Sequence, residues 1–372
     1  MSDAKQAGPL SGCRIIELAG IGPGPYCTQL LADMGAEVIV VDRPGGMPYM
    51  IDGRGKKSMV LDLRKPEAVE VVLRLVETAD ILTEGYRPGV AERLGVGPED
   101  CLKRNPKLIY GRMTGWGQVG PWASMAGHDI NYLSITGYLS LIGKKDEVPP
   151  VPLNLVGDYG GGSMFLAMGI LSAMFKAQKT GIGDVVDAAI IDGVSSMMGI
   201  VHSLSAFGLW KPERQKNLLD GGAPFYRCYK TADKKYMAVG CIEPQFFALM
   251  LKIIDVSPDE YGEQNDRNKW SRQHDLLESV FGTKTRDRWA ELFEGTDACV
   301  TPVLDLTEAQ EHPHNKARNS HFKFSGMSHP HPAPRLRSVK YSDPAPIPQK
   351  GVDTVNVLRS IGCSEDTIEL LT

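Results

Sequence analysis

Two short stretches of the sequence combine residue types that could move a proton. The first, residues 127–132 (GHDINY), places the imidazole of His128 beside the carboxylate of Asp129. The second carries Asp158 just ahead of glycines 160–162, which run into an apolar segment. If that segment is a helix, its first backbone N–H groups and positive dipole end face any oxyanion that forms there. His128 and Asp158 are therefore the candidate acid and base.

Each of these two residues also has an ordinary structural explanation. His128 could cap a helix or lie in the core, and Asp158 could be the N-cap of the helix that follows it. The glycines weaken the second explanation, because each costs a helix up to ~1 kcal/mol relative to alanine. Glycine is tolerated where a ligand must approach the backbone closely. The pair therefore depends on the fold bringing His128 and Asp158 together.

The composition narrows the class of protein. The chain has 372 residues, of which 42% are hydrophobic and 23% are charged. These values favour a globular protein of two domains and argue against long disorder. A net charge of −4 gives no reason to expect nucleic acid as a partner. The seven scattered cysteines form no C-x-x-C pair, which indicates reduced thiols and neither a disulfide framework nor a zinc site.

No stretch of the sequence is typical of a membrane anchor or a targeting signal. The first residues have no apolar signal core, and the last three are not a peroxisomal address. The longest apolar run, residues 164–175, is too short to span a bilayer. We therefore expect a cytoplasmic protein with no membrane insertion.

Alternating strands and helices predict an α/β fold with a largely parallel, Rossmann-like sheet. The expected strands span residues 13–18, 37–41, 58–63, 81–84, 108–113 and 184–189. The expected helices span residues 26–34, 65–77, 98–105, 164–179 and 191–209. Ligands of such sheets bind outside the carboxyl ends of the strands. Arg43, Glu84, Arg87 and the loop 115–121 would lie at this edge.

The first strand–loop–helix unit must be tested against a dinucleotide site. Its glycines fall at positions 20, 22 and 24, which is not the G-x-G-x-x-G spacing. Pro23 and Pro25 also remove backbone N–H donors that a pyrophosphate would need. The loop is therefore predicted to be a sharp turn into a helix.

The character of the sequence changes after Trp210. Residues 1–210 are predicted to form the N-terminal part of a large domain, and 211–224 a polar linker. Residues 225–327 would form a smaller α+β domain with a hairpin at 226–230 and 236–240. A helix at 245–254 and a strand at 299–304 would complete it. The proline-rich segment 328–372 would return to the large domain and contribute its C-terminal part.

Other candidate groups have weaker signals. Basic residues gather near the expected strand ends, and their spacing favours a solvated face over a polyanion site: Arg43, Arg54, Lys56, Lys57, Arg64, Lys65, Arg87 and Arg93. The His-Pro-His strings 312–314 and 329–331 lack metal-ligand spacing and are expected to be exposed loops. Glu243 opens a helix, where an acid favours the macrodipole. The methionines of residues 164–198 are typical of a helix core, although they could offer an adaptable apolar surface.

Several strings of this sequence resemble the family III CoA-transferase superfamily. They are residues 20–27, 31–36, 41–45, 54–63, 105–110 and 115–118. Within that superfamily, residues 126–133 and 152–158 are similar to the α-methylacyl-CoA racemases. The resemblance covers nearly the whole chain, and GHDINY is its most specific part.

The resemblance implies an interlocked homodimer with an active site between the large domain of one subunit and the small domain of the other. It implies a racemase that interconverts (R)- and (S)-2-methylacyl-CoA through an enolate, with His128 and Asp158 as the two acid/base residues. Glu243 would act beside His128 from across the dimer. The alternative is a CoA-transferase with a covalent Asp158 intermediate. Transferase branches, however, typically carry a glutamine–aspartate type of pair where this chain has His128-Asp129.

The resemblance also implies how the substrate is held. The nucleotide part of CoA would contact Arg43, Val60, Leu61, Asp62 and Leu63, with further contacts from Glu84, Arg87 and Arg93. The pantetheine and thioester would lie against Gly127, His128, Asp129, Ile130, Asn131 and Tyr132. The backbone N–H of Asp158 would help to hold the enolate oxygen. No metal or redox cofactor is expected, since CoA is part of the substrate.

Overall fold

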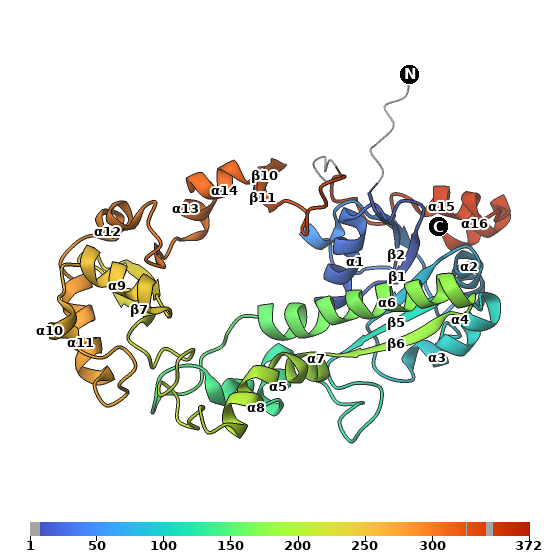
Figure 1. The fold of residues 1–372 in the computed structure, drawn as a ribbon. Coiled ribbons are helices and arrows are strands. Elements are labelled where there is room, and N and C mark those ends of the chain that lie inside the picture. The colour runs from blue at the N-terminus through green and yellow to red at the C-terminus, as the bar shows by residue number, and fades with distance from the viewer. Residues whose placement is uncertain (1–7, 325, 340–344) are drawn as a thin grey trace. The chain divides into compact units, whose positions relative to one another are not determined.

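The computed structural model describes residues 8–324, 326–339 and 345–372. The chain divides into two compact units (Figure 1). Unit 1 comprises Met1–Thr136, Pro152–Met197 and Arg318–Thr372. Unit 2 comprises Gly137–Val151 and Met198–Ala317. Each unit is described by itself.

Unit 1 is built on a six-stranded sheet in the order β3-β2-β1-β4-β5-β6. Its strands are β1 (Arg14–Leu18), β2 (Glu37–Asp42), β3 (Lys57–Val60), β4 (Ile81–Glu84), β5 (Ile109–Thr114) and β6 (Asp184–Ala189). All neighbouring strands pair in parallel. This confirms the predicted α/β class, and apolar runs such as Val38–Val41 are buried as expected for a covered parallel sheet.

Helices lie on both faces of this sheet. The helices of unit 1 are α1 (Pro23–Asp33), α2 (Pro66–Val76), α3 (Val90–Arg93), α4 (Pro98–Arg104), α5 (Asp129–Ile135), α6 (Met164–Thr180), α7 (Ile190–Met197), α15 (Thr354–Ser360) and α16 (Glu365–Leu371), with a 3₁₀ turn at Ile51–Gly53. Ile16 and Leu18 of β1 pack in one core with α2, α4, α15 and α16. Glu17, on the opposite face, bonds to Thr28 of α1. The β1 alternation therefore assigns these helices to opposite faces.

Several helix boundaries differ from the predicted ones. α1 begins at Pro23 and not at Tyr26, because proline suits the first helical position, where its missing N–H costs nothing. The predicted helix 191–209 is two helices, α7 and α8 (Gly199–Ala206), which are interrupted at Met198. They belong to different units. A continuous apolar pattern did not reveal this interruption.

The helix that carries Asp158 begins earlier than predicted. Residues Leu155–Ser163 form a π-helical segment that continues directly into α6, so the helix does not start at the glycines. Together they make a 26-residue helix, Leu155–Thr180, which by length and composition alone could cross a membrane. Leu166 and Ile170 are fully buried and lie close to Gly111 of β5, as expected for a core helix. Met164, Met168 and Met197 are exposed, so their prediction as core residues was wrong, whereas Met198 is buried as predicted.

Unit 2 contains a three-stranded antiparallel sheet, β7 (Tyr226–Lys230), β8 (Tyr236–Gly240) and β9 (Val300–Pro302). The predicted hairpin therefore has the expected bounds. The other elements are η2 (Tyr138–Leu141), α8, α9 (Pro244–Ile253), α10 (Pro258–Tyr261), α11 (Trp270–Phe281), α12 (Arg286–Phe293), α13 (Leu306–Glu311) and α14 (Pro313–Ala317). Large buried aromatic residues, including Phe225, Trp289 and Phe281, form its core.

After unit 2 the chain re-enters unit 1. A short antiparallel hairpin, β10 (His321–Phe324) and β11 (Met327–Pro330), comes first. Residues 340–344 of the proline-rich segment lie outside the described residues. The hydroxyl of Thr354 then accepts the backbone N–H of Val60 at 3.1 Å. The C-terminal helices therefore fasten to the carboxyl end of β3.

Candidate active site

A pocket of about 380 Å³ opens in unit 1 at the carboxyl ends of β1, β4 and β5. Loops 20–25, 83–88 and 113–116 line it, together with His128 and Asp158. In the strand order, β1 and β4 are neighbours at the point where the chain reverses its direction across the sheet. Open α/β sheets bind ligands at this switch point. The fold therefore brings the two candidate residues to the expected binding position.

His128 reaches the pocket from the N-terminus of α5. It is the N-cap of that helix, and its backbone N–H donates to Oδ1 of Asn131 at 3.0 Å. The side chain is exposed. This bond fixes the extended backbone of His128 at the helix end.

A packed aromatic group supports the backbone just before His128. The rings of Trp116 and Tyr132 meet edge to face, with centroids 4.7 Å apart. Gly127 lies against both, since a Cβ there would be 2.8 Å from Tyr132 and 2.9 Å from Trp116. The hydroxyl of Tyr132 donates to the carbonyl of Gly127. Only glycine fits at this position, which explains one residue of the GHDINY string.

Asp158 lies in the first turn of the π-helical segment and is half-buried. Nδ2 of Asn154 donates to its Oδ2 at 3.3 Å. Burial raises the pKa of the Asp158 carboxyl, and the nearby charge of Asp129 adds to the increase, although Asn154 and His128 oppose it. A carboxylate with a raised pKa in a pocket suits proton transfer better than an ordinary aspartate.

The backbone N–H of Asp158 is already engaged. It donates to Oδ1 of Asp129 at 2.8 Å. The expectation that this N–H would hold an enolate oxygen was therefore wrong. Nothing in the sequence indicated this hydrogen bond, because residues 129 and 158 meet only in the folded chain.

The glycines after Asp158 are required for protein packing. A Cβ on Gly161 would lie 2.6 Å from Val194 Cγ2, and one on Gly193 would lie 1.9 Å from the carbonyl oxygen of Gly161. The π-helical segment and α7 thus cross with their backbones in contact. A Cβ on Gly162 would lie 3.1 Å from Pro23 of α1. The expectation that Gly161 and Gly162 admit a ligand was wrong, because neighbouring helices fill this space.

Of the predicted CoA contacts, five line the pocket: Gly127, His128 and Tyr132, described above, together with Glu84 and Arg87. Arg87 is exposed beside it. Glu84 also lines it but is only 2% exposed, and its Oε1 accepts Nε of Arg112 at 2.9 Å. Burial raises the pKa of Glu84, although the N–H of Tyr86 and the Arg112 guanidinium counteract it. The hydrogen bonds of the Glu84 carboxylate are therefore made to Arg112 and Tyr86 of the protein itself.

The other predicted CoA contacts lie at the same edge of the sheet, outside this pocket's lining. Arg43 follows β2 and is exposed, and Val60 is the last residue of β3. Leu61 is buried and Leu63 packs against the core, so both side chains face the protein. Arg93 is exposed at the end of α3, and Asp62 forms an ion pair with Arg64. Asp129, Ile130 and Asn131 form the first turn of α5.

Glu243 belongs to unit 2, where it is the N-cap of α9. Its role beside His128 stays a prediction. The pKa of the Cys299 thiol in the same unit is raised, mainly by burial and then by the negative charge of Glu243.

Two of the basic residues predicted to be solvated are buried in ion pairs. Nη2 of Arg54 lies 2.6 Å from Oδ2 of Asp33, and both side chains are 3% exposed. Nζ of Lys56 lies 2.8 Å from Oε2 of Glu17. The prediction was wrong for Arg54 and Lys56, because their partners come from α1 and β1. An acid between the core residues of β1 was the available signal.

The prediction that both histidine strings are exposed loops was wrong, because Pro313 and His314 begin α14 and His329 and Pro330 end β11. His329 lies in β11 and is only 2% exposed, with its ring 5.2 Å from that of Phe322. Burial, followed by the charge of Arg54, lowers the pKa of His329. Among the described residues, no group of three or more His, Cys, Asp or Glu side chains could hold a metal ion.

Comparison with known proteins identifies the family. The model of CoA-transferase family III matches residues 10–354. The chain belongs to CoA-transferase family III. The resemblance to this family, carried by strings such as residues 20–27 and 54–63, is thereby confirmed.

This family III protein is similar to its relatives over most of its length. It is 45% identical to alpha-methylacyl-CoA racemase of Mus musculus over 96% of this chain and 95% of that protein. Human alpha-methylacyl-CoA racemase is also 45% identical, over 88% of this chain and 86% of that protein. A CAIB/BAIF family protein from Brucella suis has the same fold. Its solved structure covers 96% of this chain and 100% of its own, with a TM-score of 0.83 at 24% identity.

Proposed function

We propose that this protein is a racemase that interconverts the (R)- and (S)-2-methylacyl-CoA thioesters, and hence an isomerase of lipid metabolism. The observation that carries the proposal is that His128 and Asp158 line one pocket from two separate elements. The 45% identity to racemases of mouse and human supports the substrate class.

The reaction is a 1,1-proton transfer. One base removes the α-proton of the thioester, and the electron pair of the C–H bond moves into an enolate. The conjugate acid of the other residue then donates a proton to the opposite face of the same carbon. His128 serves one enantiomer in this scheme and Asp158 serves the other, so each residue ends the turnover in the opposite protonation state. No redox change occurs, and we expect no cofactor besides the CoA of the substrate.

The enolate oxygen needs hydrogen-bond donors, and the N–H of Asp158 is engaged with Asp129. The first-turn N–H groups of a helix have no partner within the helix. In α5 these include the N–H groups of Asp129 and Ile130, directly after His128. We assign the enolate oxygen to this helix end. Arg87 would contact the CoA part of the substrate from the pocket, with Arg43 and residues 60–63 farther along the sheet edge.

The decisive measurement is exchange at C2. In deuterated water, the protein should incorporate deuterium at C2 of either 2-methylacyl-CoA enantiomer while it interconverts the two. His128→Ala should abolish interconversion. Full activity of that variant would contradict the proposal.

The alternative is CoA transfer through a covalent Asp158 intermediate, as the family name implies. It predicts that CoA appears on an added carboxylate without deuterium at C2. Hydroxylamine should then attack the activated Asp158 carbonyl, release the bound CoA or carboxylate and leave a hydroxamate on Asp158, whereas a racemase forms no such intermediate. A third possibility is binding of acyl-CoA with neither reaction.

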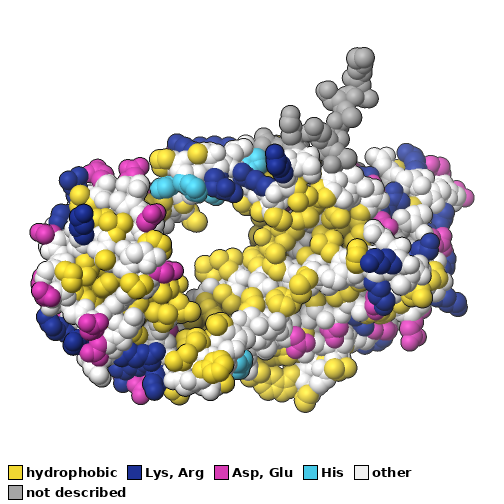
Figure 2. All heavy atoms as spheres, viewed as in Figure 1, with side chains coloured by type: hydrophobic (Ala, Val, Ile, Leu, Met, Phe, Trp, Pro, Cys, Tyr) yellow, Lys and Arg dark blue, Asp and Glu magenta, His cyan; other side chains and the backbone are white. Residues whose placement is uncertain are grey.

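We further propose that two copies of the chain form the interlocked homodimer implied by the resemblance, with Glu243 supplied near His128 of the other copy. An apolar stripe on α6 supports a partner surface: Met164, Met168, Leu171 and Phe175 are 50%, 58%, 37% and 61% exposed. Hydrophobic side chains gather over this helix in Figure 2. Sedimentation should give twice the 40.6 kDa chain mass, and Met168→Glu should shift it toward the monomer. The cytoplasm remains the compartment that we expect.

A further inference from the structure

Asp129 is the carboxylate next to His128, and its side chain is directed at the protein. Its Oδ1 accepts the backbone N–H of Asp158 at 2.8 Å. The carboxyl group is half-buried, and burial raises its pKa, although the N–H groups of Asp158 and Gly157 counteract this. No ion pair to Asp129 or Asp158 occurs within the part of the chain that the structure describes. The bond joins two segments that are otherwise separate in sequence.

The segment that receives this bond is shaped for it. A Cβ on Gly157 would lie 2.2 Å from Oδ1 of Asp129 and 2.9 Å from its Cγ. Gly157 is buried, and no larger residue would leave room for the carboxylate. Glycine at this position therefore admits the Asp129 side chain to the π-helical turn. Gly157 thus makes room for a side chain, whereas Gly161 makes room for the backbone of α7.

We propose that Asp129 is a positioning residue that sets the placement of the two bases relative to each other. His128 is the N-cap of α5, and Asp129 is the first residue of that helix. One carboxylate thus connects the helix end that carries His128 to the turn that carries Asp158. The inference rests on the proposed racemase function, because only a two-base reaction requires both groups at one carbon.

A first-turn acid also favours the helix dipole, which would be a purely structural role. That role needs no acceptor for the N–H of Asp158 and no glycine at position 157. A displacement of about 1 Å at a reacting group can cost 10²-fold in rate. The two roles therefore differ in what they predict for the chemistry.

The test compares three variants with the wild type in the full-length protein. Asp129→Ala removes the acceptor, Asp129→Asn keeps an oxygen acceptor without the charge, and Gly157→Ala displaces the carboxylate from the other side. We expect Asp129→Ala and Gly157→Ala to lower kcat about 10²-fold with a much smaller change in KM. Asp129→Asn should recover most of this loss. The matched control is Asp184→Asn, which removes an exposed ion pair between Asp184 of β6 and Lys176 of α6 and should retain activity.

Deuterium at C2 separates positioning from general damage. When Asp158 is displaced, the enantiomer that His128 deprotonates should still exchange, but it should invert far more slowly than it exchanges. The other enantiomer should lose both exchange and inversion. A structural role alone would lower exchange and inversion together for both enantiomers.

Three outcomes would overturn the inference. They are an unchanged kcat in Asp129→Ala, equal losses in Asp129→Ala and Asp129→Asn, and a raised KM with unchanged kcat. If Asp129→Ala does not fold, the exchange-to-inversion ratios of Asp129→Asn and Gly157→Ala decide, and symmetric losses count against it. A wild-type protein that fails to exchange at C2 would overturn the proposed function as well. Exchange by the wild type with no asymmetry in the variants would overturn only the role of Asp129.

Discussion

Two carboxylates of the candidate site in unit 1 and those of a polar network in unit 2 have opposite surroundings. Asp129 and Asp158 are half-buried, and burial raises the pKa of both. In unit 2, Glu308 lies between two cations, and the Arg286 guanidinium, followed by Lys235, holds its pKa well below the usual range. Folding thus raises the pKa of the two carboxyl groups in unit 1 and lowers the pKa of Glu308 in unit 2.

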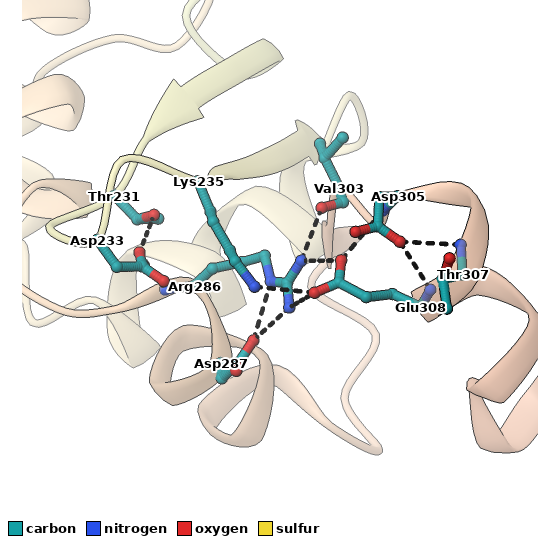
Figure 3. A network of polar contacts seen from close by, with 9 residues as sticks. All are labelled: Thr231, Asp233, Lys235, Arg286, Asp287, Val303, Asp305, Thr307 and Glu308. Carbon is teal, nitrogen blue, oxygen red and sulfur yellow. Dashed lines mark hydrogen bonds and ion pairs between the residues drawn. The ribbon is translucent and has the colours of Figure 1, made fainter.

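The unit 2 network is a structural tie (Figure 3). Arg286 of α12 is 5% exposed, and its Nη1 lies 2.5 Å from Oε2 of Glu308. It also donates to the carbonyl of Val303 at 3.1 Å. Lys235 adds a second cation at 2.8 Å from Oε1. Glu308 belongs to α13, so these bonds hold the helix that leads out of the unit.

This difference distinguishes structural from chemical acids. A carboxylate that accepts several charge-assisted bonds is a poor proton acceptor near neutral pH, because its anion is already stabilised. A half-buried carboxylate that accepts only neutral donors keeps a proton more readily. Perturbed groups in a pocket are accordingly the better candidates for catalysis.

Among changes to these acids and their partners, the largest effect is expected from Asp158→Asn. Loss of a positioned acid/base residue should lower racemisation by about 10²–10⁴-fold. Folding stability should not fall, because the change removes a desolvated charge near Asp129. Chiral analysis of the product and thermal unfolding check the two parts. A variant that loses stability but keeps half of its activity would place Asp158 with the structural acids.

The buried pair in unit 1 should behave in the opposite way. Lys56→Met leaves the Glu17 carboxylate without its cation in a site where the two side chains are 1% and 4% exposed. We expect a loss of about 3–5 kcal/mol in the free energy of unfolding, measured with urea. Adding Glu17→Met should recover much of it. No recovery in the double variant would show that the cost does not come from an unpaired charge.

The Glu308 network makes a prediction about acid. Because the pKa of Glu308 is lowered by folding, its stabilisation is present above the unfolded value of about 4.3 and is lost as pH falls through the lower folded pKa. Glu308→Gln should therefore melt at a lower temperature than the wild type at pH 7. The gap between their melting temperatures should narrow in strong acid. A gap that does not depend on pH would exclude the ion pairs as its cause.

The smallest expected effect is a shift in a pH profile. The racemisation direction in which Asp158 removes the proton should lose rate as pH falls through the pKa of Asp158, and burial and Asp129 raise that pKa above the ordinary value of about 3.9. The groups that act on Asp158 besides Asp129 are His128, which opposes the shift, and Asn154. Asp129→Asn should move the acid limb of kcat/KM to lower pH. A move to higher pH would contradict the electrostatic assignment.

Much of the fold was predictable because its signals are local. The apolar run of β4, the run of β6 and the hairpin of β7 and β8 have the expected bounds. Helix starts were misplaced by a few residues where proline begins the helix, as at Pro23. For the candidate site, residue types drew attention to His128 and Asp158, and the sheet pattern indicated the edge where they would lie.

The sequence by itself determined the class of fold, the family strings and the two residues most suited to proton transfer. Only the tertiary structure decided what each charge touches. Arg54 and Lys56 are buried because α1 and β1 supply their partners, and Gly161 is needed because α7 crosses it. The bond from Asp158 to Asp129 joins residues 29 positions apart. Local patterns describe a residue's own segment, whereas burial, pairing and pKa depend on segments that meet only when the chain folds.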